Sequence, residues 1–312
     1  MPAPMTARIL DFDTTKLTSA YSRNPSKKTD TRSSVSRLIT RLSTVLQTSI
    51  ELAEILHIFN DEVRQIVPFD GIAYQHQASR YEYSIGKTNG HSTSYRLQTP
   101  DDFLGELSFH RNKTRFTEAE LETIERLIVS LIYPLRNGLR YQEAVKSALT
   151  DALTGAGNRI SMENVMAREF DLASRYHQPL SILMLDLDYF KNVNDQHGHA
   201  TGDYVLKSVV HSLQAASRCA DMTFRYGGEE FGILLLDTTT EMALSLAENL
   251  SKELASTPMI HDKQEIKITL SFGITQINES FKSHDQWIDM ADKALYQSKQ
   301  NGRNQATIIN CD

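Results

Sequence analysis

The chain has 312 residues, of which 40% are hydrophobic and 23% charged, so it is long enough for two globular domains of ordinary size. A formal net charge of −6 argues against a protein whose whole surface binds nucleic acid. Two cysteines are too few for a zinc cluster or a disulfide framework, and no apolar run approaches the roughly 20 residues of a membrane helix. We therefore expect a cytoplasmic protein with neither a signal peptide nor a membrane segment.

The first segment, residues 1–37, is rich in Ser, Thr, Lys and Arg and has few apolar residues. This composition predicts a flexible N-terminal arm, and a helix that binds a partner is the alternative. Residues 38–67 follow with apolar side chains at steps of three and four, which predicts one helix. Pro68 and Gly71 end that periodic pattern.

An α+β domain is predicted over residues 38–139. After the first helix come four strand-like segments, residues 72–76, 81–85, 94–97 and 105–110. A long helix is then predicted from Thr117, with Glu118 and Glu120 favouring its first turn.

Three segments of this domain are similar to the GAF family of sensor domains. They are Val67-Pro68-Phe69-Asp70, Leu104-Gly105-Glu106-Leu107 and the start of the long helix at Phe116-Thr117-Glu118. The resemblance implies a GAF-like α+β sensor domain that also serves dimerisation. The domain has no haem, flavin or metal motif, so the N-terminal ligand stays unknown.

The long helix carries an apolar stripe. Its members are Leu121, Ile124, Ile128, Leu131 and Leu135, continued after a slip by Leu139, Val145 and Leu149. The stripe either packs on its own domain or pairs with a second chain as a short coiled coil. Pro134 and Gly138 would kink the helix, and residues 140–150 are predicted to form a helical linker.

The pattern changes at Asp151, and residues 151–312 predict a second domain. In order, we expect a strand at 180–185, a helix at 202–217, strands at 222–226 and 231–236, a helix at 239–255, a strand at 266–274 and a helix at 284–300. This β-α-β-β-α-β order with flanking helices is typical of a ferredoxin-like, palm-type fold of the α+β class.

Topology brings two acidic segments of this domain together. The first two strands run parallel because a crossover helix joins them, and the third returns between them, antiparallel to both. The first strand ends at Asp186 and Asp188, and the turn before the third carries Glu229 and Glu230. Clustered carboxylates raise one another's pKa unless a cation intervenes, which favours a Mg²⁺ site at this edge. An ordinary acidic surface turn is the alternative, above all for Asp188.

Five ordered motifs carry a family resemblance. Arg225-Tyr226-Gly227-Gly228-Glu229-Glu230-Phe231 is similar to the signature of the GGDEF domain, with Glu in place of the third-position Asp. The other motifs are Asp151-Ala152-Leu153-Thr154-Gly155 with Asn158-Arg159, Asp186-Leu187-Asp188-Tyr189-Phe190-Lys191 with Asn194-Asp195, Gly198-His199 and Gly202-Asp203, Ser271-Phe272-Gly273-Ile274, and Ala291-Asp292-Lys293-Ala294-Leu295-Tyr296 with Lys299 and Gly302-Arg303-Asn304. The chain departs from the family at Ala156-Gly157, where larger residues are common.

The resemblance implies a diguanylate cyclase, which condenses two GTP molecules into cyclic di-GMP and releases two pyrophosphates. Positioning and charge stabilisation dominate such phosphoryl transfer. Each domain offers one nucleotide pocket, so we expect an active homodimer of C2 symmetry. An inactive domain that only binds GTP or cyclic di-GMP is one alternative, and another palm-type nucleotide cyclase or polymerase is the second.

Metal and catalytic roles also follow from the resemblance. Asp186, Glu229 and the carbonyl of Leu187 are expected to bind Mg²⁺ or Mn²⁺, with two ions in each active site. Glu229 is the expected acceptor of the proton from the attacking 3′-hydroxyl, and Glu230 supports the second metal or the same step. Lys191 is grouped with the catalytic residues.

Substrate-binding roles fall on a further set of residues. Asn194 and Asp203 are expected to read the guanine edge, for which an amide and a carboxylate offer suitable groups. Gly227 and Gly228 free the backbone for close approach by phosphate. The residues expected to face the triphosphate are Phe190, Lys191, Lys299 and Arg303. Simpler interpretations are a core position for Phe190, a helix-start acid for Asp203, and solvated helix-end charges for Lys299 and Arg303.

Arg218-Cys219-Ala220-Asp221 resembles the inhibitory RxxD site of the family, where product binds away from catalysis. An Arg suits bidentate contacts to phosphate and guanine. The resemblance therefore implies an allosteric product-binding site at Arg218 and Asp221, although Arg-x-x-Asp is in itself a common pattern.

Overall fold

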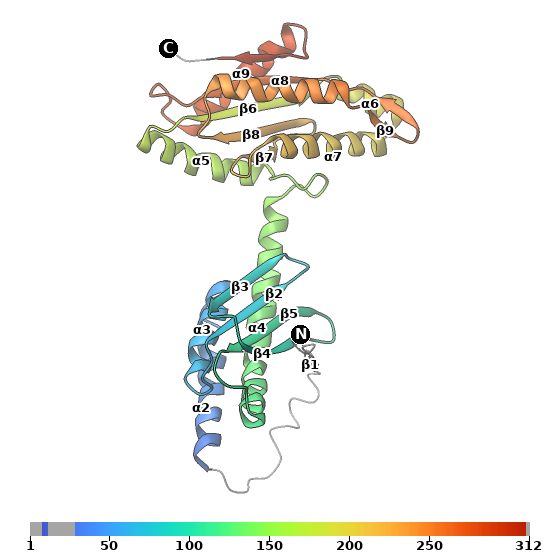
Figure 1. Cartoon of the computed structure of the whole chain (residues 1–312). Helices are drawn as coiled ribbons and strands as arrows, with labels where there is room; N and C mark the ends of the chain where they lie inside the picture. Colours follow the sequence, from blue (N-terminus) through green and yellow to red (C-terminus); the bar gives the residue numbers. More distant parts are fainter. Residues whose placement is uncertain (1–7, 12–28, 310–312) are drawn as a thin grey trace. The chain divides into compact units, whose positions relative to one another are not determined.

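The computed structural model describes residues 8–11 and 29–309, and Figure 1 shows how the chain is divided. There are two compact units, Met1–Val145 (unit 1) and Lys146–Asp312 (unit 2), so the boundary falls within the predicted linker at 140–150. Within the described ranges, no helix combines the length and the apolar character that crossing a membrane requires.

Unit 1 is a mixed sheet with helices. Its helices are α2 (Thr29–Val45), α3 (Leu52–Arg64) and most of α4 (Glu118–Leu149), and its strands are β1 (Arg8–Asp11), β2 (Gly71–His76), β3 (Tyr81–Gly86), β4 (His91–Gln98) and β5 (Phe103–Arg111). The sheet order is β1-β4-β5-β2-β3. All neighbours pair antiparallel except β1 and β4, which are parallel.

The N-terminal segments differ from the sequence-based prediction. Strand β1 and the start of α2 lie within the predicted arm of residues 1–37, whose residues 1–7 and 12–28 lie outside the described part. The predicted single helix at 38–67 is two helices. Thr48 donates its hydroxyl to the carbonyl of Val45 at 2.7 Å, and the Ser49 hydroxyl accepts from the Glu51 N–H at 3.1 Å. Such local bonds compete with helical hydrogen bonds and explain the break.

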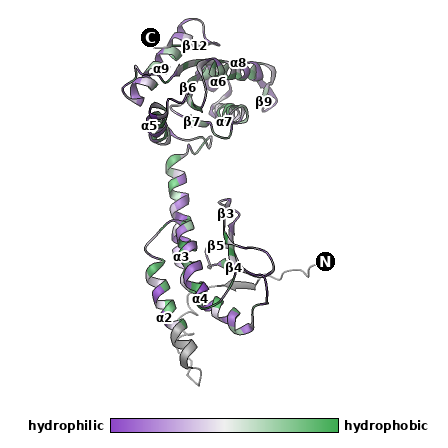
Figure 2. Cartoon of the chain, turned by 60° about the vertical axis from the view of Figure 1, so that its left-hand side comes forward, coloured by the Kyte–Doolittle hydropathy of each residue, from purple (hydrophilic) through white to green (hydrophobic). Residues whose placement is uncertain are grey.

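The core of unit 1 lies between the helices and one face of the sheet. Alternate strand residues such as Ile72 and Tyr74 are buried there, as the two-residue period of a strand requires. Members of the predicted stripe on α4, from Ile124 to Leu135, belong to the same core, so this part of the stripe packs on its own domain. Figure 2 shows hydrophobic and hydrophilic segments mixed along α2 and α4, as expected for helices with one buried face.

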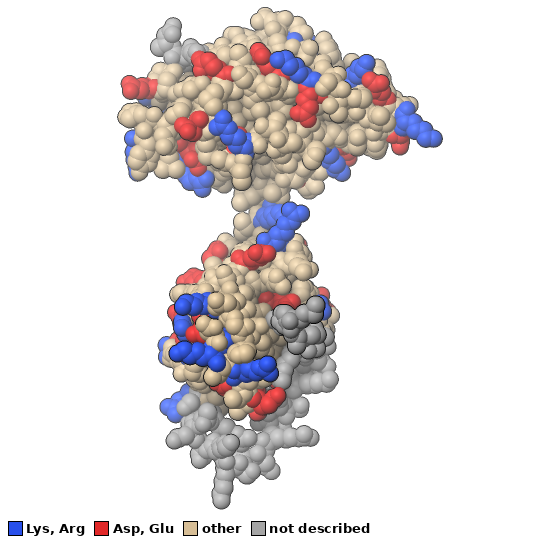
Figure 3. Space-filling model, viewed as in Figure 1, with Lys and Arg blue, Asp and Glu red and all other residues tan. Residues whose placement is uncertain are grey.

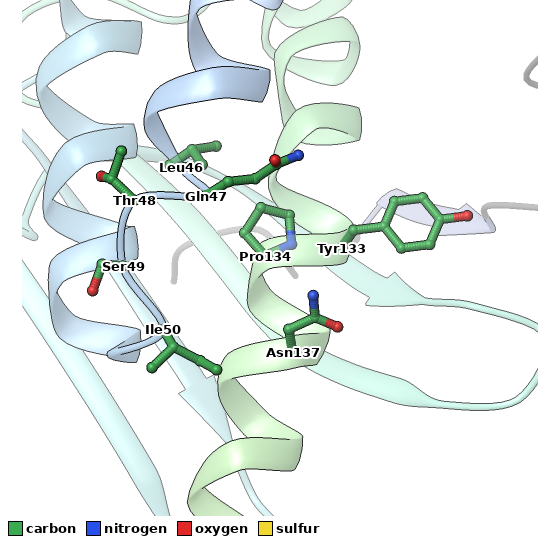
Figure 4. Close-up of a pocket in the computed structure, with 8 residues that line it drawn as sticks. All are labelled: Leu46, Gln47, Thr48, Ser49, Ile50, Tyr133, Pro134 and Asn137. Atoms are coloured by element: carbon green, nitrogen blue, oxygen red, sulfur yellow. The ribbon is translucent and has the colours of Figure 1, made fainter.

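A cavity lies where the connection between α2 and α3 faces α4 (Figure 4). Gln47, Thr48 and Ser49 line it from the connection, and Tyr133 and Asn137 line it from α4. Pro134 also borders the cavity, inside the helix rather than at a helix end. The lining therefore combines hydrogen-bonding groups with the proline ring.

A network of hydrogen bonds joins the start of α4 to the sheet. The Arg111 guanidinium donates to Glu120 at 2.9 Å and, through Nε, to the carbonyl of Pro68 at 2.8 Å. Glu120 also accepts from the backbone N–H of Thr117 at 2.8 Å and from its hydroxyl at 3.0 Å. The hydrogen bond from Arg111 is the main cause that lowers the pKa of Glu120 to about 2.

We expect Glu120→Ala to destabilise unit 1 at neutral pH, whereas Glu122→Ala on the same helix should have little effect. Because the folded-state pKa of Glu120 is depressed to about 2, its stabilisation is present above the unfolded-state pKa and is lost as pH falls through the folded one. Thermal unfolding at pH 7 and pH 2.5 tests this: the difference between wild type and Glu120→Ala should shrink in acid. An equal difference at both pH values would contradict the prediction.

Unit 2 contains the remaining elements. They are α5 (Arg159–Tyr176), β6 (Leu180–Leu187), α6 (Phe190–His197), α7 (His199–Ala216), β7 (Met222–Arg225), β8 (Glu230–Leu236), α8 (Thr240–Ser256), β9 (Met259–His261), β10 (Gln264–Ile266), β11 (Leu270–Gln276), α9 (His284–Gln300) and β12 (Ala306–Ile308). The main sheet has the order β12-β11-β6-β8-β7, and β9 pairs with β10 in a separate hairpin. The strand predicted at 266–274 is therefore divided, since β10 ends at Ile266 and β11 begins at Leu270.

The predicted strand arrangement is present in unit 2. Strand β8 lies between β6 and β7 and is antiparallel to both, which makes β6 and β7 parallel. Helices cover both faces of the sheet: α6, α7 and α8 pack on one core cluster and α5 and α9 on the other. Every residue of β6 is buried, as expected for a central strand covered on both faces. On the visible face of unit 2, acidic and basic side chains are interspersed (Figure 3).

Candidate active site

Strand alternation decides which helix meets the acidic end of β6. Even-numbered residues of β6, such as Ile182 and Met184, pack in the cluster with α5 and α9. Asp186 has the same parity and therefore lies on the side of the sheet that α9 covers. On α9, Ala291 and Leu295 are buried in that cluster, and Lys299 follows at the next four-residue step. The two periodicities bring Lys299 to Asp186.

The acidic turn joins the same edge of the sheet. Asp186 on β6 is directly opposite Glu230 on β8, and the Leu187 N–H donates to the carbonyl of Glu229 at 3.2 Å. The N–H groups of Tyr226 and Gly227 both donate to the carbonyl of Glu230, which closes the turn. The predicted cluster of Asp186, Glu229 and Glu230 is thus assembled by strand register.

The two glycines of this turn differ in their surroundings. A Cβ added at Gly227 would lie 2.4 Å from the Glu230 carboxylate, whereas a Cβ at Gly228 would meet nothing within 4 Å. Gly227 therefore leaves room for the side chain of Glu230, and Gly228 leaves the outer side of the turn open.

Burial and mutual repulsion shape the charges of the cluster. Burial is the main cause that raises the pKa of Asp186, and the Lys299 ammonium at 2.7 Å opposes the rise. Burial, followed by the charge of Asp186, also raises the pKa of Glu229. Both carboxylates are therefore short of positive charge even with Lys299 in place, which is the condition that a divalent cation satisfies.

An ion pair braces the acidic turn from the side. The Arg225 guanidinium contacts Asp151 at 3.0 Å and donates to the carbonyl of Gly228 at 2.7 Å. Asp151 also accepts from the N–H and the hydroxyl of Thr154. The opening motif of the domain thus holds the turn, a role that the sequence analysis did not assign to Asp151 or Arg225.

Asp188 differs from the other acidic residues at this edge. Its carboxylate accepts from the hydroxyls of Thr269 at 2.7 Å and Ser271 at 2.6 Å and from the N–H of Asn304 at 3.0 Å. With these donors satisfied and a side chain that is almost fully buried, Asp188 ties β6 to β11 and to the segment after α9. Asp188 is therefore not the acidic surface residue that was the alternative for it, but a buried anchor whose carboxylate is already occupied by three donors.

The segment after β6 carries the residues expected to bind nucleotide. Phe190 is buried in the core with α6 and α7, which agrees with the simpler interpretation of its side chain, and Lys191 beside it is exposed. The Asn194 amide packs against Gly202, where an added Cβ would lie 2.0 Å from its oxygen. Asp203 follows on α7 and is exposed. The two expected guanine readers thus lie on two helices in direct contact.

Arg303 lies beside an aromatic ring that the sequence analysis left without a role. Its guanidinium is 4.6 Å from the ring centroid of Tyr189, and Nη1 donates to the Tyr189 hydroxyl at 3.4 Å. Both residues have positive φ angles, 55° for Tyr189 and 64° for Arg303. The cation–π contact holds Arg303 near the start of α6.

The RxxD segment forms a turn before β7. The Asp221 carboxylate accepts from the Arg218 N–H at 2.8 Å, while its other oxygen is buried without a partner among the described residues. Arg218 is exposed. This geometry gives Asp221 a local structural role and leaves the Arg218 guanidinium on the surface.

A divalent metal fits the chemistry of the acidic edge. No group of three or more His, Cys, Asp and Glu side chains within residues 8–11 and 29–309 is arranged to hold an ion by itself. Two carboxylates and a carbonyl are nevertheless a donor set that suits Mg²⁺, which commonly takes one or two carboxylates and completes its shell with substrate phosphates and water.

The family whose description is "Diguanylate cyclase, GGDEF domain" matches residues 148–305, about half of the chain. The chain belongs to the GGDEF family. Members of this family generally need a divalent metal, which agrees with the donor set at Asp186 and Glu229.

Curated GGDEF proteins extend the similarity beyond unit 2. Diguanylate cyclase DgcS of Shewanella oneidensis is 30% identical over 266 residues, covering 83% of this chain and 84% of that protein. Diguanylate cyclase A of Treponema denticola is 44% identical over 131 residues, covering 42% of this chain. The chain spans 35% of the Treponema protein and 55% of probable diguanylate cyclase DgcC of Escherichia coli.

Solved GGDEF structures agree with the fold of unit 2. The coiled coil and GGDEF domain of DgcB from Caulobacter crescentus, in complex with c-di-GMP, gives a TM-score of 0.56 at 28% identity and covers 61% of this chain and 99% of that one. The GGDEF domain of the same protein alone, also with c-di-GMP, gives 0.50 at 30% identity, covering 52% of this chain and 95% of that one.

We expect Lys299→Met to raise the pKa of Asp186 further, because the mutation removes the hydrogen bond and the charge that now lower it. Carboxyl-carbon NMR titration of the metal-free protein measures this directly. Lys293→Met, an exposed position on the same helix, is the matched control and should leave the titration unchanged. An unaltered Asp186 titration in Lys299→Met would show that the ion pair does not form in solution.

Proposed function

We propose that this protein condenses two GTP molecules into cyclic di-GMP and releases two pyrophosphates. The observation that carries the proposal is the register of β6 and β8, which sets Asp186 opposite Glu230 with Glu229 beside them. This acidic edge lies in the unit that matches the family described as "Diguanylate cyclase, GGDEF domain". In the reaction the 3′-oxygen of one GTP bonds to the α-phosphorus of the other, and the bond to the leaving pyrophosphate breaks.

Asp186, Glu229 and the Leu187 carbonyl are the proposed metal donors, with two Mg²⁺ or Mn²⁺ ions in each active site. Bound there, the metal supplies stabilisation of the charge that develops on the phosphates. Glu229, a carboxylate beside Asp186 at this edge, is also the proposed acceptor of the proton of the attacking 3′-hydroxyl. Glu230, opposite Asp186, is the proposed support for the same step.

The triphosphate is proposed to lie between the acidic turn and the start of α6. Lys191, Lys299 and Arg303 supply positive charge around this position. Because the Phe190 side chain is in the core, its contribution is proposed to come from its N–H at the helix start, where backbone donors favour an anion. Gly227 and Gly228 present backbone without side chains on the other side.

Asn194 and Asp203 are proposed to read the guanine edge. A carboxylate accepts from the guanine N1–H and amino group, and an amide both donates and accepts. Their placement on touching helices at the Asn194–Gly202 contact supports one shared base pocket.

Two copies of the chain are proposed to face each other in the active state. One unit 2 offers one nucleotide site, and a cyclic product with two equivalent linkages needs two such sites. Unit 1 is proposed to be a GAF-like sensor domain that controls this encounter through α4. Its helix-and-sheet layout supports the suggestion, and α4 continues from unit 1 into unit 2.

Glu229→Gln should retain the fold and lose roughly 10³-fold or more in turnover, because a metal donor that is also a base is removed. The assay is incubation of the full-length protein with Mg²⁺ and GTP, or ATP, with products identified by mass. Glu253→Gln, an exposed acid on α8, is the control. Since the Glu229 pKa is raised, loss of its charge should also leave the metal-free protein at least as stable at pH 7.

Cyclic di-GMP synthesis by folded Glu229→Gln at the wild-type rate would refute the assignment of Glu229. Wild type that binds GTP without product would favour the inactive binding domain, and comparable rates with ATP would refute the role of the guanine readers.

Product is proposed to inhibit through Arg218 and Asp221. Inhibition from a separate site would be non-competitive with GTP, since it biases the arrangement of the dimer rather than occupancy of the nucleotide pocket. Arg218→Ala should raise the inhibitory constant at least about tenfold through loss of a charged hydrogen-bonding group. Initial rates against added cyclic di-GMP, for this variant and for Arg175→Ala on α5, measure the effect. Superimposed inhibition curves would remove Arg218 from the site.

A further inference from the structure

We propose that the β9–β10 hairpin holds α6 and α7 at a fixed angle, with His261 and Gln264 as positioning residues. The place where these two helices meet is called the corner. The inference rests on the proposed function of Asn194 and Asp203 and adds the elements that fix their separation. Figure 1 shows β9 beside α6 and α7, at the end of the unit where these helices meet.

The corner depends on the angle between α6 and α7. His197 ends α6 and His199 begins α7, with only Gly198 between them at a φ of 82°. Asn194 lies on α6 and Asp203 on α7, so a change of angle at Gly198 would change the distance between them. The Thr201 hydroxyl, which donates to the His197 carbonyl at 2.9 Å, bridges the corner internally.

The hairpin contacts both helices with one cross-strand pair. His261 and Gln264 are directly opposite each other in the β9–β10 register. The His261 ring stacks on Tyr204 of α7, with centroids 4.7 Å apart and planes at 21°. The Gln264 side-chain oxygen is 2.7 Å from Nδ1 of His197 at the end of α6. His261 therefore contacts α7 and Gln264 contacts α6, so one cross-strand pair touches both helices of the corner.

Each contact lies next to a guanine reader. Tyr204 directly follows Asp203 in sequence, and His197 is one helical turn from Asn194, on the same side of α6. The hairpin itself is fixed, because Met259 and Ile266 are buried in the core of unit 2 at its base. A hairpin anchored in this way can resist rotation of α6 against α7 when no nucleotide is bound.

The turn of the hairpin supports a specific geometry. Asp262 and Lys263 both have positive φ angles, 48° and 65°, as in the tight two-residue turns that match the twist of a hairpin. These turns keep opposed residues in register, so His261 and Gln264 point together toward the corner rather than to opposite faces.

The test is the double variant His261→Ala with Gln264→Ala in the full-length protein. A looser corner weakens base binding equally in the ground and transition states, so KM for GTP should rise about tenfold while kcat changes by less than about twofold. Preference for GTP over ITP, which lacks the 2-amino group, should fall as well. Ile260→Ala, an exposed residue of the same hairpin, is the control and should leave KM unchanged.

Conservative variants separate positioning from simple stability. His261→Phe retains a ring for Tyr204, and Gln264→Glu retains an oxygen that accepts from His197, so each should restore KM toward wild type. Should the double variant fail to fold, Gln264→Ala alone is the substitute, because Gln264 is exposed and its loss leaves the core intact.

An unchanged KM and an unchanged GTP preference in a folded hairpin variant would overturn this role of the hairpin and leave the proposed function standing. A loss of melting temperature and kcat with KM unchanged would assign the hairpin to stability alone, and would also overturn it. Wild type that shows no preference for GTP would instead contradict the proposed function.

Discussion

Negative charge concentrated at one end of β6 is the constraint on which the architecture of unit 2 depends. Strand pairing sets Asp186 against Glu230, and burial then raises the pKa of Asp186 and Glu229. Carboxylates in this position destabilise the fold unless cations or donors oppose them. Lys299 supplies part of the opposing charge at 2.7 Å, and a divalent ion with substrate phosphates can supply the rest. This unmet demand for positive charge supports the proposal that the site takes up a metal-bound polyphosphate.

Neighbouring groups keep the cluster from rearranging. Asp188, two residues after Asp186, is held by donors from β11 and from the segment after α9, so the end of β6 cannot move to separate the charges. Arg225 joins Asp151 to the carbonyl of Gly228 and fixes the turn on the other side. Each anchor uses an ion pair or a charge-assisted bond, which is stronger and more directional than a neutral one.

The topology of unit 2 was predictable because it follows from short-range pattern and connection rules. A helical crossover from β6 to β7 makes these two strands parallel. The tight turn at Gly227–Glu229 then returns the chain, so that β8 lies between them and is antiparallel to both. The acidic edge followed from that arrangement alone. The break between α2 and α3 was missed because hydrophobic periodicity continues across it, while side-chain hydrogen bonds at Thr48 and Ser49 end the helix.

Residues that act across long sequence separations were harder to predict. The partners of Asp188 are Thr269, Ser271 and Asn304, which come from two later segments. Ser271 and Asn304 belong to motifs of the family resemblance, but their uncharged side chains gave no sign that they face a carboxylate. Lys299 was predicted to face the triphosphate, and its contact with Asp186 was not predicted. Its four-residue spacing from Leu295 and Ala291 was a signal that it lies on the buried face of α9. Two such periods, one from a strand and one from a helix, locate a side chain better than either does alone.

The acidic edge and the proposed base contacts lie on neighbouring elements of unit 2. Charge is concentrated at the end of β6 and in the turn before β8, both held by the main sheet. The proposed base contacts, Asn194 and Asp203, follow β6 in sequence on α6 and α7, which are held by the core and by the β9–β10 hairpin outside that sheet. The core that holds these two helices also contains Leu183, Leu185 and Leu187 of β6, the strand that carries Asp186. The proposed base contacts and the proposed phosphate chemistry are therefore linked through the core of unit 2 and through the turn at Tyr189 that leads from β6 into α6, and the hairpin adds a further support on the side of the base.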